Sequence, residues 1–172
     1  LRRGAECTES GTGQWRSFLL ERAQILRDEL KRPDLAADAY EDLISSDLPE
    51  DLRPEIFEKL CDLLQQLGLF SRLKKVLLQQ AEHLGSEAAP LWLQLGQLAE
   101  GPLNAPEAAL VFYRKSHELA PANLDSLAHL KEMLYTEQRW DDLLRVIKSS
   151  VQKLENIEHI YELQMECGAL AE

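Results

Sequence analysis

The sequence predicts an all-α protein built as a right-handed superhelical stack of antiparallel helix hairpins, an α-solenoid. The first sign is composition, because Leu, Ala, Glu, Gln, Lys and Arg dominate the chain and β-branched residues are scarce. Such side chains lose little rotamer freedom in a helix. The second sign is that apolar residues recur at three- and four-residue spacing from Gln14 onward. The third is a regular succession of turn residues that interrupts this period.

Residues 1–13 hold three glycines among Thr, Ser and Glu without any apolar period, and we expect them to form a flexible tail. After them the pattern predicts helices over about 14–31, 34–45, 53–67, 71–84, 86–100, 106–119, 123–137, 141–153 and 157–172. Proline or glycine closes most of these segments, and Ser86 and Asn123 are expected N-caps. Because the joints are short, consecutive helices should form antiparallel hairpins.

The hairpins repeat along the sequence. The segments Pro33–Tyr40 and Pro106–Tyr113 both read Pro, acid, any residue, Ala, three residues and Tyr, and they start 73 residues apart. This distance is two periods of about 36 residues, a length typical of helical repeats. The opening helices agree, because Phe57, Trp92 and Leu127 follow one another at intervals of 35 residues. We therefore expect one repeat domain over 14–172, with hairpins at 14–48, 49–85, 86–121 and 122–155 and a leading helix at 156–172.

This pattern resembles the tetratricopeptide repeat, which reads W-x2-L-G-x2-Y, then A-x3-F, then P. The best-matching hairpin carries Trp92, Leu95, Gly96, Ala109, Tyr113, Ser116 and Pro121. The other hairpins keep fewer of these residues, among them Ala36 and Tyr40 in the first and Trp140 in the fourth. In the first hairpin, Leu20, Ala23 and Gln24 are aligned with Trp92, Leu95 and Gly96.

The residue types of the pattern have a physical purpose. Gly96 and Ala109 are small, so the two helices of one hairpin can cross at close range. Large side chains then fill the space against neighbouring hairpins, and we expect the three tryptophans, Trp15, Trp92 and Trp140, to serve this packing. Pro121 should end its helix because it lacks an amide hydrogen.

No catalytic motif is present: the sequence has no H-E-x-x-H, Walker loop or G-x-S-x-G. We therefore expect no catalytic residue and no cofactor. Glu155 and His159 could share a metal ion, but a surface charge pair is the simpler interpretation, and no metal site is predicted. The three cysteines lie far apart, which argues against a zinc site or a disulfide framework. A reducing compartment, with the cytoplasm favoured, is compatible with them.

The formal net charge is −11. An acidic surface repels phosphate backbones and anionic lipid, so nucleic acid and membranes are not expected partners. A basic peptide or protein fits better, although the charge could also serve only to keep the protein in solution.

The resemblance implies that the leading helix of each hairpin lines a concave groove. The positions projected onto it are Glu55, Glu58, Asp62, Gln65 and Gln66, then Leu93, Gln97 and Glu100, then Asp125, Ala128, Glu132, Tyr135 and Thr136. This set contains carboxylates and amides but no Lys or Arg, unlike arrays that clamp an acidic C-terminal tail. A basic or amide-rich extended segment suits such a groove. The alternative is that the groove is only solvated and the partner docks on the convex face or an edge.

The sequence therefore predicts a non-enzymatic protein–protein interaction scaffold. One alternative is a regulatory or substrate-recruiting segment of a larger enzyme, since the chain starts at Leu1 and ends within a helical pattern. A second alternative is a self-assembly module, because the last helix has an apolar stripe with no helix after it. That stripe consists of Ile160, Leu163, Cys167 and Leu170.

Overall fold

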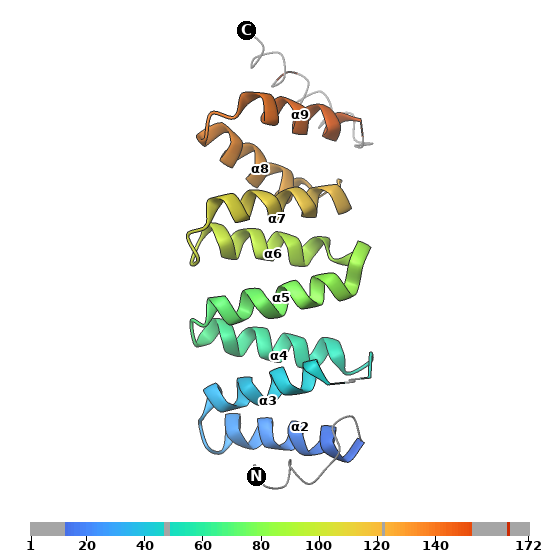
Figure 1. Ribbon diagram of the computed structural model, residues 1–172, viewed down its shortest axis with the longest axis vertical. Helices are drawn as coiled ribbons and strands as arrows, with labels where there is room; N and C mark the ends of the chain where they lie inside the picture. Colours follow the sequence, from blue (N-terminus) through green and yellow to red (C-terminus); the bar gives the residue numbers. More distant parts are fainter. Residues whose placement is uncertain (1–12, 47–48, 122, 153–164, 166–172) are drawn as a thin grey trace. The chain divides into compact units, whose positions relative to one another are not determined.

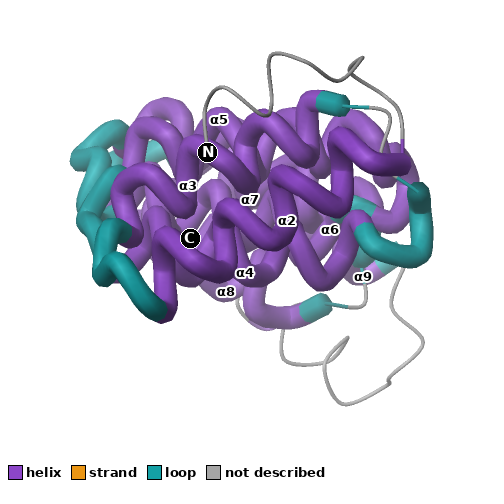
Figure 2. The backbone as a smooth tube through the Cα atoms, turned by 90° about the horizontal axis from the view of Figure 1, so that it is seen from below, coloured by secondary structure: helices purple, strands orange, loops and turns teal. Residues whose placement is uncertain are grey.

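The computed structural model describes residues 13–46, 49–121, 123–152 and Met165 of the 172-residue chain (Figure 1). Within these ranges it is built from α-helices joined by turns, with no strand (Figure 2), which confirms the all-α prediction. The elements are α2 (Gly13–Asp28), α3 (Pro33–Ser45), α4 (Arg53–Gln66), α5 (Phe70–Leu84), η1 (Gly85–Glu87, a 3-10 turn), α6 (Ala89–Glu100), α7 (Pro106–Leu119), α8 (Leu124–Thr136) and α9 (Trp140–Val151). None of the helices in this part of the chain is long and apolar enough to cross a membrane.

Most helix starts follow from the residues that the sequence places there. Pro33 and Pro106 are the first residues of α3 and α7, where the missing amide hydrogen costs no hydrogen bond. Asn123 caps α8 as expected, because its side chain accepts a hydrogen bond of 2.9 Å from the Asp125 amide. The expected cap at Ser86 is wrong. The chain first makes the turn η1, and α6 begins at Ala89 with no side-chain cap.

The four hairpin turns within the described chain share one backbone conformation. A residue with positive φ lies two positions before the following helix in each of them: Lys31 (49°), Gly68 (67°), Asn104 (47°) and Gln138 (57°). This left-handed residue reverses the chain, and the helix end is closed by a backbone bond such as Leu69 N to Leu64 O at 2.9 Å. The sequence indicated the turn at Gly68, but the other three residues carry a Cβ and give no such sign.

The first helix is registered one residue earlier than expected. The backbone bond from Arg32 N to Leu26 O (2.8 Å) recurs 73 residues later from Ala105 N to Ala99 O (2.7 Å). By this offset Ala23, which is fully buried, stands at the position of Gly96, whereas Gln24 is exposed. The two adjacent leucines at 19 and 20 allow either register on apolar pattern alone, which explains the error.

The chain divides into two compact units, Leu1–Val76 and Leu77–Glu172, and each is described by itself. In the N-terminal unit α3 packs against both α2 and α4. Its core is apolar and includes Leu19, Ala23, Ala36, Tyr40, Leu43, Ile56, Leu60 and Leu64. Arg72, in the first turn of α5, forms salt bridges with Asp38 (2.7 Å) and Glu41 (2.9 Å) of α3.

In the C-terminal unit α6 packs on α7, α7 on α8, and α8 on α9. A Cβ built on Gly96 would lie 2.4 Å from the Tyr113 ring, so the expected close crossing of α6 and α7 is confirmed. Leu95, Ala109 and Tyr113 are fully buried there. A hydrogen bond also joins α6 and α7, because Ser116 Oγ donates to Ala89 O at 2.8 Å.

The three tryptophans differ in burial. Trp92 is buried and packs against Phe112, with 5.8 Å between the ring centroids, as expected for a packing residue. Trp15 is half-buried. Trp140 departs from the expectation, because it is 40% exposed. As the first residue of α9, it lies at the hairpin end and contacts Tyr135 instead of filling an interface between helices.

Candidate functional site

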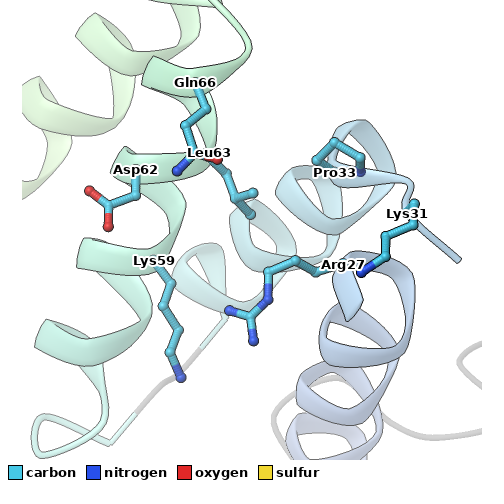
Figure 3. Close-up of a pocket in the computed structure, with 7 residues that line it drawn as sticks. All are labelled: Arg27, Lys31, Pro33, Lys59, Asp62, Leu63 and Gln66. Atoms are coloured by element: carbon cyan, nitrogen blue, oxygen red, sulfur yellow. The ribbon is translucent and has the colours of Figure 1, made fainter. Parts of the chain in front are cut away.

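The projected groove residues of the N-terminal unit all lie on α4 and all are exposed. These are Glu55, Glu58, Asp62, Gln65 and Gln66. Two of them, Asp62 and Gln66, border a pocket of about 440 Å³ between α2, the start of α3 and α4 (Figure 3). Its walls are formed by Arg27, Lys31, Pro33, Lys59, Asp62, Leu63 and Gln66.

This pocket is lined by cations as well as by two residues of the projected set. Arg27 of α2 extends toward Lys59 of α4, whereas the Asp62 carboxylate points away from both, and Lys31 also lines the pocket (Figure 3). The Arg27 guanidinium binds Asp28 through two hydrogen bonds of 2.7 and 2.9 Å and holds the pKa of that carboxyl below its usual value. Lys59 is paired with Glu55 on its own helix. The N-terminal unit therefore presents a mixture of charges here.

The sequence prediction missed these cations because it projected groove positions on the third, fifth and seventh helices only, and Lys59 was not among them. In the observed register Arg27 stands 73 residues before Glu100, at the equivalent place on its helix. The turn residues Lys31 and Asn104, which both have positive φ and also lie 73 residues apart, show the same alignment of the two hairpins. This alignment is visible in the backbone geometry and not in the side-chain types.

The C-terminal unit has a different surface along α6 and α8. On α6, Gln97 and Glu100 are exposed and Leu93 is half-buried. On α8 the exposed residues are spaced by three, four and three positions, so they form one stripe along the helix. The stripe consists of Asp125, Ala128, Glu132 and Tyr135, followed by Thr136. We call this stripe together with Gln97 and Glu100 the α6–α8 face.

A tyrosine of α7 joins the two helices of this face. The Tyr113 hydroxyl donates a 2.6 Å hydrogen bond to Glu100 Oε2, and His129 Nδ1 of α8 lies 3.6 Å from the same oxygen. The rings of Tyr113 and His129 are stacked with centroids 4.7 Å apart. Burial, and then the bond to Glu100, raises the pKa of Tyr113, so the hydroxyl stays protonated and continues to donate. The Glu100 carboxylate is therefore held in place at the junction of α6 and α8.

The α6–α8 face carries negative charge and amide groups. Its charged members are Glu100, Asp125 and Glu132, and no lysine or arginine belongs to it. The neighbouring Lys131 is half-buried and is not a member of the stripe. A cationic or amide-rich group approaching this face would meet three carboxylates, of which Glu100 is already held by Tyr113.

Two aromatic rings lie at the end of this face. Tyr135 is 61% exposed and Trp140 is 40% exposed, and their ring centroids are 5.2 Å apart with an interplanar angle of 84°. Tyr135 belongs to the projected set, but the projection gave no reason to place Trp140 beside it. The signal was its position directly after the hairpin turn, which the left-handed residue Gln138 produces.

A second pocket, of about 310 Å³, lies on the surface of α7 and at Arg139 in the C-terminal unit. It is lined by Glu107, Leu110, Val111, Arg114, Lys115, Glu118 and Arg139. Both signs of charge occur on its walls, and Arg139 is held by Glu137 and Asp142. It therefore has less charge selectivity than the α6–α8 face.

No protein-family model matches the chain, and a search of curated proteins gives no match either.

The described residues contain no group of three or more His, Cys, Asp or Glu side chains that could hold a metal ion. The pair His117 Nε2 and Ser150 Oγ, 2.8 Å apart, is buried between α7 and α9, and Ser150 has no exposed surface. Burial raises the pKa of the Cys61 thiol to about 12, which leaves little reactive thiolate. Glu155 and His159 lie outside the described residues.

Proposed function

We propose that this chain is a tetratricopeptide-like interaction module, a superhelical array that binds an extended segment of another protein. In this proposal the α6–α8 face of the C-terminal unit receives a basic or amide-rich segment. The observation that carries it is the exposed stripe of acidic and polar residues on α8, which is joined to α6 through Glu100.

Equivalent burial in successive hairpins supports the repeat. Leu60, Leu95 and Leu130, which lie 35 residues apart, all have no exposed surface. The second helices agree in the same way, since Tyr40, Leu77, Tyr113 and Ile147 are all buried. Each helix pair would thus present its apolar stripe to the next pair, as a helical repeat requires.

The ordered carboxylate supports the role of the face in binding. Glu100 is fixed by the Tyr113 hydroxyl, so a ligand cation that pairs with it need not immobilise a mobile side chain. Glu132, one turn of α8 beyond His129, forms no ion pair within the described residues and remains exposed. Gln97 offers an amide that can bind the backbone of an extended peptide.

Calorimetric titration with a lysine–glycine alternating peptide tests this proposal. Neutralising the stripe with Asp125→Asn and Glu132→Gln should weaken binding about twofold to thirtyfold, because each of the two exposed ion pairs contributes about 0.2–1 kcal/mol. Higher salt should weaken wild-type binding and narrow the difference between the proteins. The matched control is Glu107→Gln with Glu118→Gln, which removes the same charge from exposed positions on α7.

The proposal fails if the peptide does not bind, or if the α7 control weakens binding as much as the α8 variant does. The second result would show that net charge alone, and not this face, attracts the peptide.

A further inference from the structure

We infer that the exposed pair Tyr135 and Trp140 binds an arginine side chain of the partner segment. This inference rests on the proposed function and specifies the residue that anchors the segment at one end of the α6–α8 face.

The two rings leave much of their surface open to a ligand. They meet edge to face, with centroids 5.2 Å apart, and are 61% and 40% exposed. Tyr135 comes from the last turn of α8 and Trp140 from the first turn of α9, so two helices joined by a tight turn fix their positions. Paired aromatic rings of this kind supply contact area at small entropic cost when a partner docks.

The charges around the pair select a cation. Glu132 lies three residues before Tyr135 on the same stripe, and Asp141 follows Trp140 in the chain; both are exposed and make no ion pair within the described residues. Arg139, which precedes Trp140 in the chain, pairs with Glu137 (3.4 Å) and with Asp142 (2.6 Å), a carboxylate that it shares with Arg145 (2.9 Å), so part of its charge is offset. A second cation would therefore meet aromatic faces bordered by uncompensated carboxylates.

The same C-terminal unit already contains one contact of this chemical kind. The Lys115 ammonium lies 4.2 Å from the centroid of the Trp92 ring. An arginine suits the Tyr135–Trp140 surface better than a lysine, because its planar guanidinium can stack on one ring while the N–H groups at its edge bind a carboxylate. In this proposal Glu132, three residues before Tyr135 on α8, accepts those hydrogen bonds.

Two peptides of equal length and charge test this inference, one alternating arginine with glycine and the other lysine with glycine. Wild-type protein should bind the arginine peptide about threefold to tenfold more tightly, as expected for an exposed cation–π contact. Tyr135→Ser should weaken binding of the arginine peptide more than binding of the lysine peptide, and so remove most of this preference. Val111→Ser is the matched control, because Val111 is 52% exposed on α7 and lies outside this surface.

A spectroscopic measurement reports on the site directly. The arginine peptide should change the fluorescence of Trp140, which is obtained as the difference between wild type and Trp140→Phe. Circular dichroism of each variant verifies that its helices are retained.

The outcomes separate the two proposals. Equal binding of both peptides, or an unchanged Trp140 signal at saturation, overturns the arginine site and leaves the basic-segment proposal standing. Absence of binding by both peptides overturns the proposed function, and the arginine site with it.

Discussion

Two tyrosines at equivalent repeat positions have their hydroxyl groups in contrasting surroundings. Tyr113 donates to the Glu100 carboxylate at 2.6 Å. Tyr40 is equally buried, but its hydroxyl has no hydrogen-bond partner among the residues described. Arg27 occupies the place of Glu100, and its guanidinium donates to Asp28 (2.7 and 2.9 Å) and makes no hydrogen bond with the Tyr40 hydroxyl.

Replacing each tyrosine with phenylalanine should therefore have different effects on stability. Tyr113→Phe removes a hydrogen bond to a carboxylate and should lower the free energy of unfolding by about 1–2 kcal/mol. Tyr40→Phe removes a buried hydroxyl that makes no bond, so it should be neutral or stabilising by up to about 1 kcal/mol. Urea denaturation of both variants measures the difference. A larger loss for Tyr40→Phe than for Tyr113→Phe would contradict this account.

Gly96 is required by the close approach of α6 and α7. Gly96→Ala places a Cβ about one ångström inside normal contact with the Tyr113 ring, which has no exposed surface and cannot swing aside. We expect a loss of about 1–3 kcal/mol in the free energy of unfolding, even though alanine favours helix over glycine by about 0.5–1 kcal/mol. In a Tyr113→Ala background the same substitution should cost little, because the ring is gone. An equal cost in both backgrounds would exclude the ring as the cause.

At the scale of the helices, the hairpin turns reuse one left-handed backbone position with different side chains. Gly68 occupies it in the second hairpin, whereas Gln138 occupies it in the fourth. Glycine adopts this conformation without steric cost, and residues with a Cβ do not. Three of the four turns therefore retain local strain that a glycine at this position would relieve.

Removing the side chain at position 138 and adding one at position 68 should change the free energy of unfolding in opposite directions. Gln138→Gly should stabilise the protein by about 0.5–1 kcal/mol by relieving strain at a φ of 57°. Gly68→Ala should destabilise it by about 1 kcal/mol; the added Cβ makes only an ordinary contact at 3.9 Å with Phe70, so the cost comes from the backbone. Thermal denaturation followed by circular dichroism gives both values. Loss of stability in Gln138→Gly would rule out strain at this turn.

The helix ends show how far sequence could predict the elements. Proline at the start of α3 and α7 and asparagine before α8 were sufficient, because their effects on the backbone are local. Ser86 failed because Gly85, at a φ of 55°, opens a further turn before α6. The register of α2 failed because it depends on which of two adjacent leucines is buried, and packing against α3 decides that.

At the scale of the whole molecule, the net charge of −11 is not distributed as one uniform surface. On the α6–α8 face of the C-terminal unit, helical spacing alone places Asp125 and Glu132 on one exposed stripe. The pocket beside α4 has mixed charge, since Arg27, Lys31 and Lys59 also line it. The pairing of Tyr135 with Trp140 could not be predicted, because it depends on the geometry of a turn.

The account as a whole depends on the α6–α8 face being the surface that binds a basic segment. The most direct test is carbodiimide labelling of carboxylates, read by mass spectrometry, with and without the lysine–glycine peptide. The account predicts that the peptide protects Asp125 and Glu132 while the exposed Glu107 and Glu118 of α7 are labelled as before. Protection of the α7 carboxylates instead, or unchanged labelling at every site in the presence of bound peptide, would contradict it.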